Sequence, residues 1–150
     1  MQSTSHYRIS TDRSQLDVAM IHQFLSQESS WAQTVPRPIV ERAIAQSLCF
    51  GLYQADRQLG FARVVTDAAT FGYLADVFIV ASHRGLGLGR RLVEAVLAHP
   101  DLQGLRRFML ATRDAHEVFR QFGFTAPSHP ELLMEQHARP MPSAAARSAG

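Results

Sequence analysis

The spacing of hydrophobic residues changes several times along this chain. Over residues 14–27 and 36–47, apolar side chains recur every three or four positions, which is the period of an amphipathic helix. We expect Ser14 to cap the first helix, because its hydroxyl can accept a hydrogen bond from the first turn. Prolines open the second helix, where they are tolerated. The faces predicted to be buried are Val18, Ile21 and Leu25 in the first helix and Val40, Ala43, Ile44 and Ser47 in the second.

Strand-like segments flank and follow this helical pair. Residues 6–10 predict an edge strand, and the runs 48–54 and 58–66, separated by a short turn, predict a β-hairpin. A third run, 70–80, is apolar and rich in aromatic residues. It is long enough to carry a bulge or to splay from a neighbour partway along. This part of the chain therefore predicts antiparallel pairing.

Helices and strands alternate in the second half of the chain. Leu88, Leu92 and Val96 fall in one column of a predicted helix over 87–98. The remaining predicted elements are a strand over 106–112, a short helix over 114–124 capped by Asp114 and closed by Gly123, and a last strand over 132–136. The order of elements predicts an α/β fold with a mixed sheet flanked by helices, not a doubly wound one.

Composition limits the classes of function. The 150 residues suit one domain, which we place at 1–140, followed by a flexible tail over 141–150. All 15 basic residues are arginine, and the net charge of +2 gives little support for binding nucleic acid. There is no apolar run of membrane-spanning length and no signal peptide, so we expect a cytoplasmic protein with no membrane partner.

Cysteine and histidine give little support for metal or covalent chemistry. The seven histidines lack ligand-like spacing, so no metal site is expected. Cys49 is the one cysteine, which excludes an intramolecular disulfide. It lies between Leu48 and Phe50 in a predicted strand, where a buried, inert thiol is expected in preference to a nucleophile.

The stretch Arg84-Gly85-Leu86-Gly87-Leu88-Gly89-Arg90 joins a predicted strand to a predicted helix. Glycines let a phosphate approach backbone N–H groups closely, and a helix N-terminus offers such groups with partial positive charge. The stretch therefore predicts an anion cradle. It lacks the Gly-Lys-Ser/Thr of a P-loop and the spacing of a dinucleotide fingerprint. A nucleotide-binding module and a plain connecting turn remain as alternatives.

These residues resemble the GNAT family of N-acetyltransferases. Arg84, Gly87 and Gly89 take the fixed positions of its Q/R-x-x-G-x-G/A motif. Residues 74–97 resemble the family's fourth strand, pyrophosphate loop and following helix, and 111–124 resembles a later helix ending in Y-x-x-x-G-F. The resemblance implies a mostly antiparallel sheet whose fourth and fifth strands splay apart, with acetyl-CoA as the acyl-donor cosubstrate in the gap.

The resemblance also implies roles for single residues. The pantetheine arm would meet the main chain of Phe78, Ile79 and Val80, and Phe119 would lie near the thioester. The pyrophosphate would be held by Arg84, Gly85, Leu86, Gly87, Leu88, Gly89 and Arg90.

The reaction implied is direct attack of a primary amine on the acetyl thioester in a ternary complex. The acceptor is a small molecule or a peptide, and a homodimer is an expectation by analogy. A backbone N–H near Phe78 could polarise the carbonyl. Asp76 is the candidate base, since it sits in an apolar strand where burial could raise its pKa. The alternative for Asp76 is a structural carboxylate satisfied by backbone or by an arginine.

Phe119 departs from the family pattern, which has tyrosine as the acid for the departing thiolate. Phenylalanine cannot donate a proton, so Tyr73, His116 or water would have to substitute. The departure keeps a second hypothesis open, namely a catalytically weak CoA-binding sensor or regulatory module of the same fold.

Overall fold

The computed structural model describes residues 6–136. The chain divides into two compact units, Met1–His116 and Glu117–Gly150. The predicted tail over 141–150 lies outside the described residues. Across 6–136, no helix combines the length and the apolar character needed to cross a bilayer.

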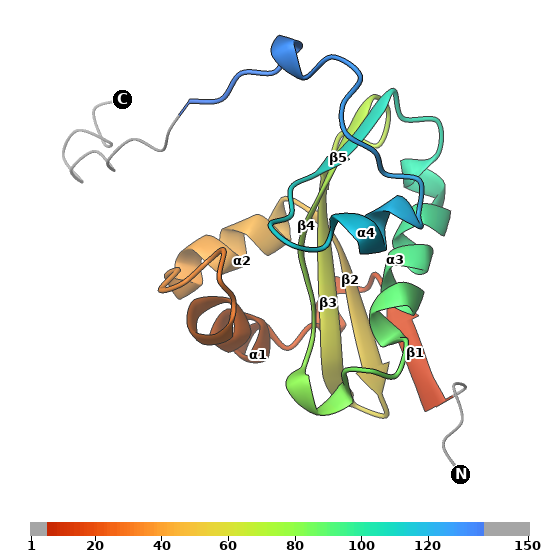
Figure 1. Cartoon of the computed structure of the whole chain (residues 1–150). Helices are drawn as coiled ribbons and strands as arrows, with labels where there is room; N and C mark the ends of the chain where they lie inside the picture. Colours follow the sequence, from red (N-terminus) through yellow and green to blue (C-terminus); the bar gives the residue numbers. More distant parts are fainter. Residues whose placement is uncertain (1–5, 137–150) are drawn as a thin grey trace, which may run out of the picture. The chain divides into compact units, whose positions relative to one another are not determined.

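The first unit is built on a five-stranded sheet in which strands follow one another in chain order (Figure 1). β1 to β4 pair in antiparallel fashion, and β4 pairs with β5 in parallel. The mixed, mostly antiparallel sheet predicted from the sequence is therefore confirmed. The strands are β1 (Tyr7–Ser10), β2 (Leu48–Gln54), β3 (Arg57–Thr66), β4 (Phe71–Ile79) and β5 (Arg107–Leu110).

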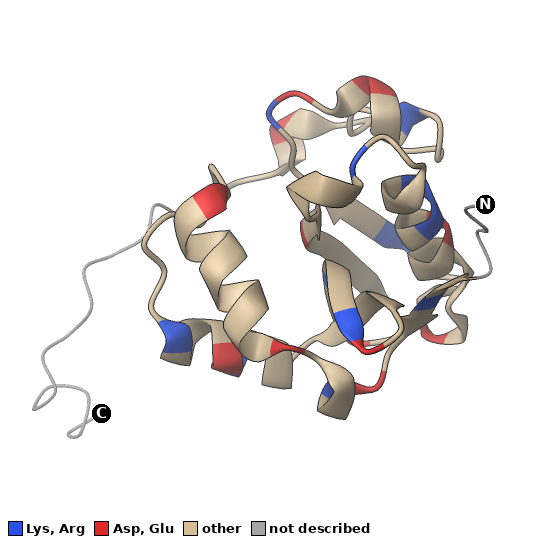
Figure 2. Ribbon diagram, turned by 90° about the horizontal axis from the view of Figure 1, so that it is seen from below, with Lys and Arg blue, Asp and Glu red and all other residues tan. Residues whose placement is uncertain are grey.

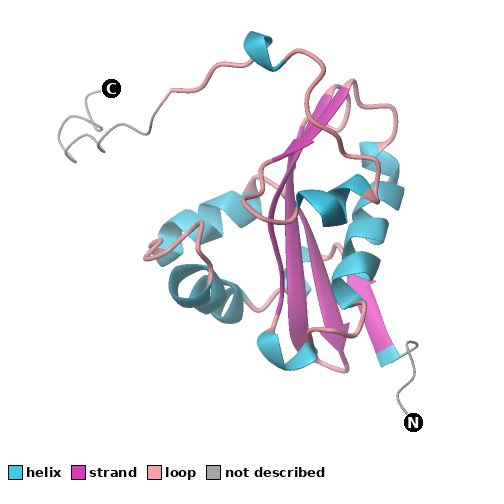
Figure 3. Cartoon of the chain, in the orientation of Figure 1, coloured by secondary structure: helices cyan, strands magenta, loops and turns pink. Residues whose placement is uncertain are grey.

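Helices cover both faces of this sheet (Figure 3). α1 (Val18–Gln23) and α2 (Arg37–Ala45) pack on one face, and α3 (Leu88–Ala98) packs on the other. The predicted column Leu88, Leu92 and Val96 is buried along α3, as its spacing requires. On the opposite face the core consists of Ile21, Phe24, Leu25, Val40, Ile44, Cys49, Phe61 and Phe78. Acidic and basic positions are interspersed along the ribbon (Figure 2).

The first predicted helix is shorter and differently capped than its periodicity indicates. Asp17, not Ser14, is the N-cap of α1, and its carboxylate accepts the Met20 N–H at 3.1 Å. The Asp17 N–H in turn donates to the side chain of Gln58 at 2.7 Å. Ser14 instead lies in a 3-10 turn and donates to Asp12. The tertiary contact with Gln58 fixes the helix start, and the local pattern does not reveal it.

A π-helical turn over Phe24–Glu28 follows α1 directly. The hydroxyls of Ser26 and Ser29 donate to carbonyls four residues earlier, at 2.8 and 2.7 Å. Such back-bonding competes with the regular helical ladder and favours a wider turn. The wider turn buries both Phe24 and Leu25 in the core beneath the loop that leads to α2.

The second unit contains little regular structure among its described residues. α4 (His116–Arg120) begins at the boundary between the units and is followed by a turn that ends at Gly123, whose φ is +92°. Gly123 therefore closes the helix as predicted, whereas the helix begins at His116, two residues after the predicted cap Asp114. The strand predicted over 132–136 is wrong: Pro130–Leu132 forms a 3-10 turn and 133–136 have no regular structure. A short apolar run does not by itself distinguish a strand from other structure, which is why this prediction failed.

Candidate functional site

β4 loses its β5 partner halfway along its length. The pairing with β5 runs from Phe71 to Leu74, and β4 then continues to Ile79. The predicted splay between the fourth and fifth strands is thus present, and it leaves one edge of residues 75–79 without a β5 neighbour. Apart from the Ile79 carbonyl, which accepts from Arg84 Nε, main-chain groups on that edge are available to an extended ligand that adds itself to the sheet.

Strand alternation decides which main-chain groups face the open edge. The Val80 N–H donates to the Leu59 carbonyl at 2.8 Å, so Val80 faces β3. Phe78, two residues back, also faces β3, while Ile79 and Val77 face the other way. Of the three residues predicted to meet a pantetheine arm, only Ile79 therefore turns its main chain to the open edge. Val77 was not among the sequence-predicted residues.

A bulge in β4 lies next to this edge. Phe61 pairs with Phe78 and Arg63 with Ala75, so two β4 residues, Asp76 and Val77, oppose one residue of β3. Asp76 has a φ of +54°, in the left-handed region where aspartate is tolerated better than most residues. The bulge predicted within 70–80 is confirmed, and its left-handed residue is the candidate base itself.

The bulge also changes which face of the sheet the side chains occupy. Before it, Tyr73 and Ala75 line a cavity on the face covered by α1 and α2. Within the bulge, Asp76 lines the same cavity. After the bulge, Phe78 packs in the core on the same side, stacked on Phe24. A regular strand would send Asp76 to the α3 face with Leu74. The extra residue is therefore what brings the Asp76 carboxylate to the cavity.

Contrary to the prediction, the glycine turn does not follow the strand directly: β4 ends at Ile79, and a 3-10 turn (Ala81–His83) separates it from Arg84. Gly85 and Gly87 have φ values of +81° and +77°, which a residue with a side chain rarely adopts. A Cβ at either position would meet nothing within 4 Å, so these glycines are required by conformation and leave open space beside the backbone. Gly89 lies inside α3 with an ordinary φ.

Gly87 is also the N-cap of α3. The Arg91 N–H donates to the Gly87 carbonyl at 3.2 Å, which starts the helical ladder. The amides of the preceding first turn, which include those of Leu88 and Gly89, have no carbonyl one turn back. The Leu88 side chain is buried, so this residue can contribute to an anion site only through its main chain. The predicted cradle is thus a helix N-terminus entered through two left-handed glycines.

Arg84 supports the turn as well as adding charge to it. Its Nε donates to the Ile79 carbonyl at 3.1 Å, across the 3-10 turn. The guanidinium thereby ties the end of β4 to the start of the glycine stretch. Arg90 lies in the first turn of α3, at the same end of the helix.

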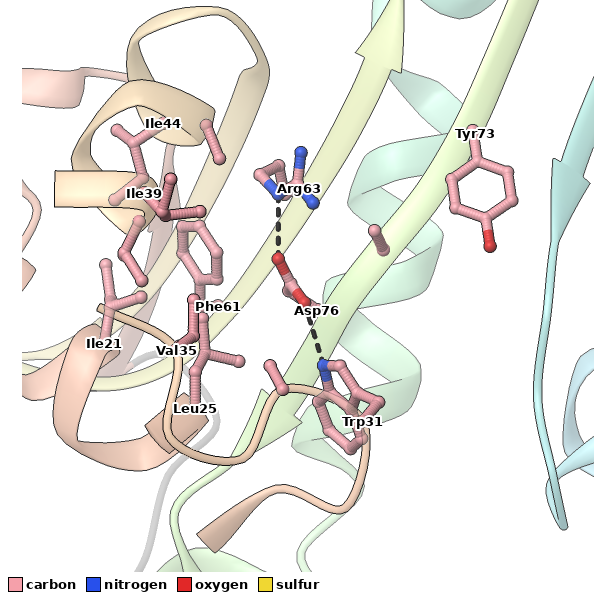
Figure 4. A pocket seen from close by; sticks show the side chains of 14 residues that line it. Ile21, Leu25, Trp31, Val35, Ile39, Ile44, Phe61, Arg63, Tyr73 and Asp76 are labelled. Carbon is pink, nitrogen blue, oxygen red and sulfur yellow. Dashed lines mark hydrogen bonds and ion pairs between the residues drawn. The ribbon is translucent and has the colours of Figure 1, made fainter. Parts of the chain in front are cut away.

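A cavity of about 380 Å³ lies on the face of the sheet covered by α1 and α2 (Figure 4). Its volume is within the range of sites that hold small molecules. Most of its lining is apolar, and we call this part the apolar wall: Ile21, Leu25, Ala32, Val35, Ile39, Val40, Ala43, Ile44, Phe61 and Ala75. The remaining lining residues, which we call the polar side, are Trp31, Arg63, Tyr73 and Asp76.

Asp76 is held by two donors on the polar side (Figure 4). Arg63 Nε donates to one carboxylate oxygen at 2.8 Å, and the indole N–H of Trp31 donates to the other at 2.8 Å. Arg63 continues to the hydroxyl of Ser47 at 3.1 Å. Asp76 therefore has the arginine partner expected of a structural carboxylate and also faces the cavity, as expected of a reacting one.

The remaining candidates from the sequence, Tyr73, His116 and Cys49, differ in whether they lie at the cavity. Tyr73 lines the cavity with Asp76, whereas His116 is an exposed residue at the start of α4. Burial raises the pKa of the Cys49 thiol to about 11, which agrees with an inert thiol. Arg63 was not among the predicted site residues. A cross-strand partner of Asp76 can be identified only once the register of β3 and β4 is known.

Phe119 belongs to the second unit. Its ring packs edge-on against Phe124 at a centroid distance of 6.0 Å, and its carbonyl accepts the Phe124 N–H at 3.2 Å. These contacts account for the F-x-x-x-G-F pattern as a local helix stop. The role of Phe119 near a thioester stays a prediction. Within residues 6–136, no three histidine, cysteine or acidic side chains are grouped to hold a metal ion.

Comparison with known proteins places this architecture among acetyltransferases. The model of the Acetyltransferase (GNAT) family matches residues 18–124. A protein of Gibberella zeae named "Putative acetyltransferase FG08082" is 36% identical over an alignment that covers 75% of this chain and 75% of that protein. A crystal structure from Xanthomonas campestris pv. campestris, assigned to the GNAT family, is 53% identical with a TM-score of 0.87 and covers 89% of this chain and 94% of that one.

More distant structures share the fold. A Brucella melitensis GNAT acetyltransferase in complex with acetyl-CoA is 18% identical, with a TM-score of 0.64 over 81% of this chain and 84% of that one. A predicted acetyltransferase with acetyl-CoA from Clostridium acetobutylicum is 13% identical, with a TM-score of 0.64 over 87% of this chain and 94% of that one.

Proposed function

The chain belongs to the GNAT family of acetyltransferases, and from this premise we propose that it transfers an acetyl group from acetyl-CoA to a primary amine. The amine nitrogen attacks the thioester carbonyl carbon directly, the carbon–sulfur bond breaks, and CoA leaves as a thiolate that takes up a proton. The observation that carries the proposal is the continuity of three features along one segment: the open edge of β4, the left-handed glycine turn and the α3 N-terminus.

On the donor side, the proposed binding groups belong mainly to the backbone. The pyrophosphate lies against the α3 N-terminus, where first-turn amides and the helix dipole favour negative charge. Arg84 and Arg90 supply additional positive charge. The pantetheine arm extends along the β4 edge that Val77 and Ile79 face. The distant relatives whose names include acetyl-CoA share this fold and support the choice of cosubstrate.

The chemistry proposed for this chain uses the two bulge residues. The Val77 amide, at the open edge, stabilises the oxyanion that forms at the thioester carbonyl. The Asp76 carboxylate, on the cavity side of the same bulge, binds the acceptor ammonium and takes its proton, directly or through water. An alkylamine has a pKa near 10, so at neutral pH most of it must lose a proton before it attacks.

The test has two stages. The first is a thermal-shift titration with acetyl-CoA, CoA, ATP and NAD in parallel, since a ligand at about 100 times its Kd adds about 2.7 kcal/mol to the free energy of unfolding. Stabilisation by acetyl-CoA and CoA alone supports the donor site, and stabilisation by ATP favours a nucleotide-binding module. The second stage measures amine-dependent release of CoA.

Phe119 keeps a second function under test. A protein that binds acetyl-CoA tightly but releases no CoA with any amine would be a sensor or regulatory module of this fold. The variant Phe119→Tyr restores the side chain that the family pattern has at this position. Faster CoA release in this variant is the result expected if protonation of the departing thiolate limits the enzyme.

A further inference from the structure

The cavity between α1, α2 and the sheet has a composition that restricts what it can bind. Ten of its 14 lining residues form the apolar wall, and α2 supplies four of them: Ile39, Val40, Ala43 and Ile44. Two of the four residues on the polar side, Arg63 and Asp76, are already paired with each other. A ligand in this cavity therefore meets a large apolar surface and a polar side whose one carboxylate is paired with Arg63.

The charge of the lining argues against ligands with several charges. Among the lining residues, all of which lie in the described part of the chain, Asp76 is the one anion and Arg63 the one cation. A second ammonium group on a ligand, away from Asp76, would lie against aliphatic side chains, with no second acidic side chain of the lining as its partner. Burying an unpaired charge costs far more than burying a methyl group of similar size gains.

The bulge fixes which end of the ligand lies where. Asp76 points into the cavity, while the main chain of its neighbour Val77 faces the open edge of β4. A nitrogen bound at Asp76 is therefore next to the edge proposed for the donor, and the rest of the ligand extends toward α2. Figure 4 shows Ile39 and Ile44 on that side, beyond Arg63 and Asp76.

We propose that the cavity selects small primary monoamines with an apolar body, with the amine at Asp76 and the body against the apolar wall. This inference names the acceptor class and rests on the proposed function for its catalytic meaning. Diamines, polyamines and amino acids are discriminated against, because each carries a further charge into the apolar wall.

The chain provides its own probe of this cavity. Trp31 is the only tryptophan of the sequence, it lines the cavity, and its indole N–H bonds Asp76. Intrinsic fluorescence therefore reports on ligands that reach the polar side, without any need for turnover. The ligands to compare are hexylamine and 1,5-diaminopentane, which differ in that an ammonium group replaces the terminal methyl.

Titration of the full-length protein with both amines, with and without saturating CoA, tests the proposal. We expect a saturable change with hexylamine and an affinity at least about 100-fold lower for 1,5-diaminopentane. Equal or tighter binding of the diamine would overturn the proposal, and so would the lack of a saturable signal with either amine. Selective binding of hexylamine without CoA release from acetyl-CoA would instead overturn the proposed function and leave the cavity assignment standing.

A charge placed in the apolar wall should change the preference. Ile39 lines the cavity but is 41% exposed, so Ile39→Glu is expected to fold. Its carboxylate gives the second ammonium a partner, and the preference for hexylamine should fall by at least about tenfold. Ala45→Glu is the matched control, because it adds the same charge to an exposed position of α2 outside the cavity. Equal preferences in the two variants would contradict the assignment of the apolar wall.

Discussion

The two sides of the β4 bulge present different groups to a ligand: main-chain groups on one side and side chains on the other. On the donor side, the glycine turn and the open strand edge present main-chain groups, and side chains are absent where the backbone must be approached. On the cavity side, the binding surface consists of side chains from α1, the π-helical turn, the loop before α2, α2, β3 and β4. A main-chain site depends on conformation, whereas a side-chain site depends on which residues fill it. The two should therefore fail in different ways when they are mutated.

The largest expected effect belongs to the main-chain side. Gly87→Trp places an indole over the α3 N-terminus, and we expect acetyl-CoA to bind at least about 1,000-fold more weakly, roughly 4 kcal/mol. The left-handed φ adds a stability cost of about 1 kcal/mol. Calorimetric titration with acetyl-CoA measures the first effect and urea unfolding the second.

Gly104→Trp is the matched control for this variant. Gly104 has a φ of +71° and equally open space at its Cβ, but it lies outside the glycine turn. It should lose similar stability and keep its affinity for acetyl-CoA. Equal loss of affinity in both variants would mean that strain, and not blocked access, explains the result.

Asp76→Asn tests the side-chain half of the bulge. Asparagine tolerates the left-handed conformation, so the bulge should persist. We expect kcat to fall about 100-fold, because the base is lost, while acetyl-CoA affinity stays unchanged. Steady-state kinetics and donor titration measure the two quantities. An unchanged kcat would remove Asp76 from the chemistry and leave it a structural partner of Arg63.

Arg63→Met addresses how the carboxylate is held. Arg63 and Asp76 are mostly buried, and removing the guanidinium leaves the Trp31 indole as the remaining side-chain donor to Asp76. The free energy of unfolding should therefore fall by about 2 kcal/mol. Arg37→Met breaks an exposed pair with Glu41 and should cost less than about 0.5 kcal/mol. Urea unfolding compares the two variants. Similar costs would show that the cavity pair is no stronger than a surface one.

The smallest effect is expected at Asp67, in the turn between β3 and β4. Hydrogen bonds from Thr70, and then from the Ala69 and Phe71 amides, hold the pKa of Asp67 well below its usual value. A lowered pKa in the folded state means that this stabilisation is present above the unfolded-state pKa, near 3.8, and is lost as the pH falls below it. Wild type should be slightly more stable than Asp67→Asn at neutral pH, with the difference shrinking in acid. A difference that grows in acid would contradict this assignment.

How well the sequence predicts each region depends on how far apart along the chain the interacting residues lie. The glycine turn and the α3 column depend on residues within a few positions of one another, and local patterns predicted both. The start of α1 depends on Gln58, far along the chain, and the prediction of Ser14 as its cap was wrong. Residues 132–134 are apolar, but no strand forms over the described residues 132–136.

The candidate site divides in the same way. The glycine residues of the donor side were predicted from a contiguous stretch. The partnership of Asp76 with Arg63 requires the β3–β4 register, and its face requires the position of the bulge. Strand alternation alone would have sent Asp76 to the α3 side of the sheet. Half of the apolar wall (Ile21, Leu25, Val40, Ala43 and Ile44) was predicted, but only as core-facing helix residues, because nothing in the local pattern distinguishes a cavity from a filled core.

The left-handed backbone of Asp76 also limits how relatives of this protein can diverge. Glycine, asparagine and aspartate adopt such a φ most readily, so most other residue types at this position carry a strain cost. The positions of α2 that line the cavity carry no such restriction, and Ile39 is partly exposed. Under the proposed function, new acceptor preferences should therefore arise by substitution along α2, while substitutions at the bulge are restricted by its backbone conformation.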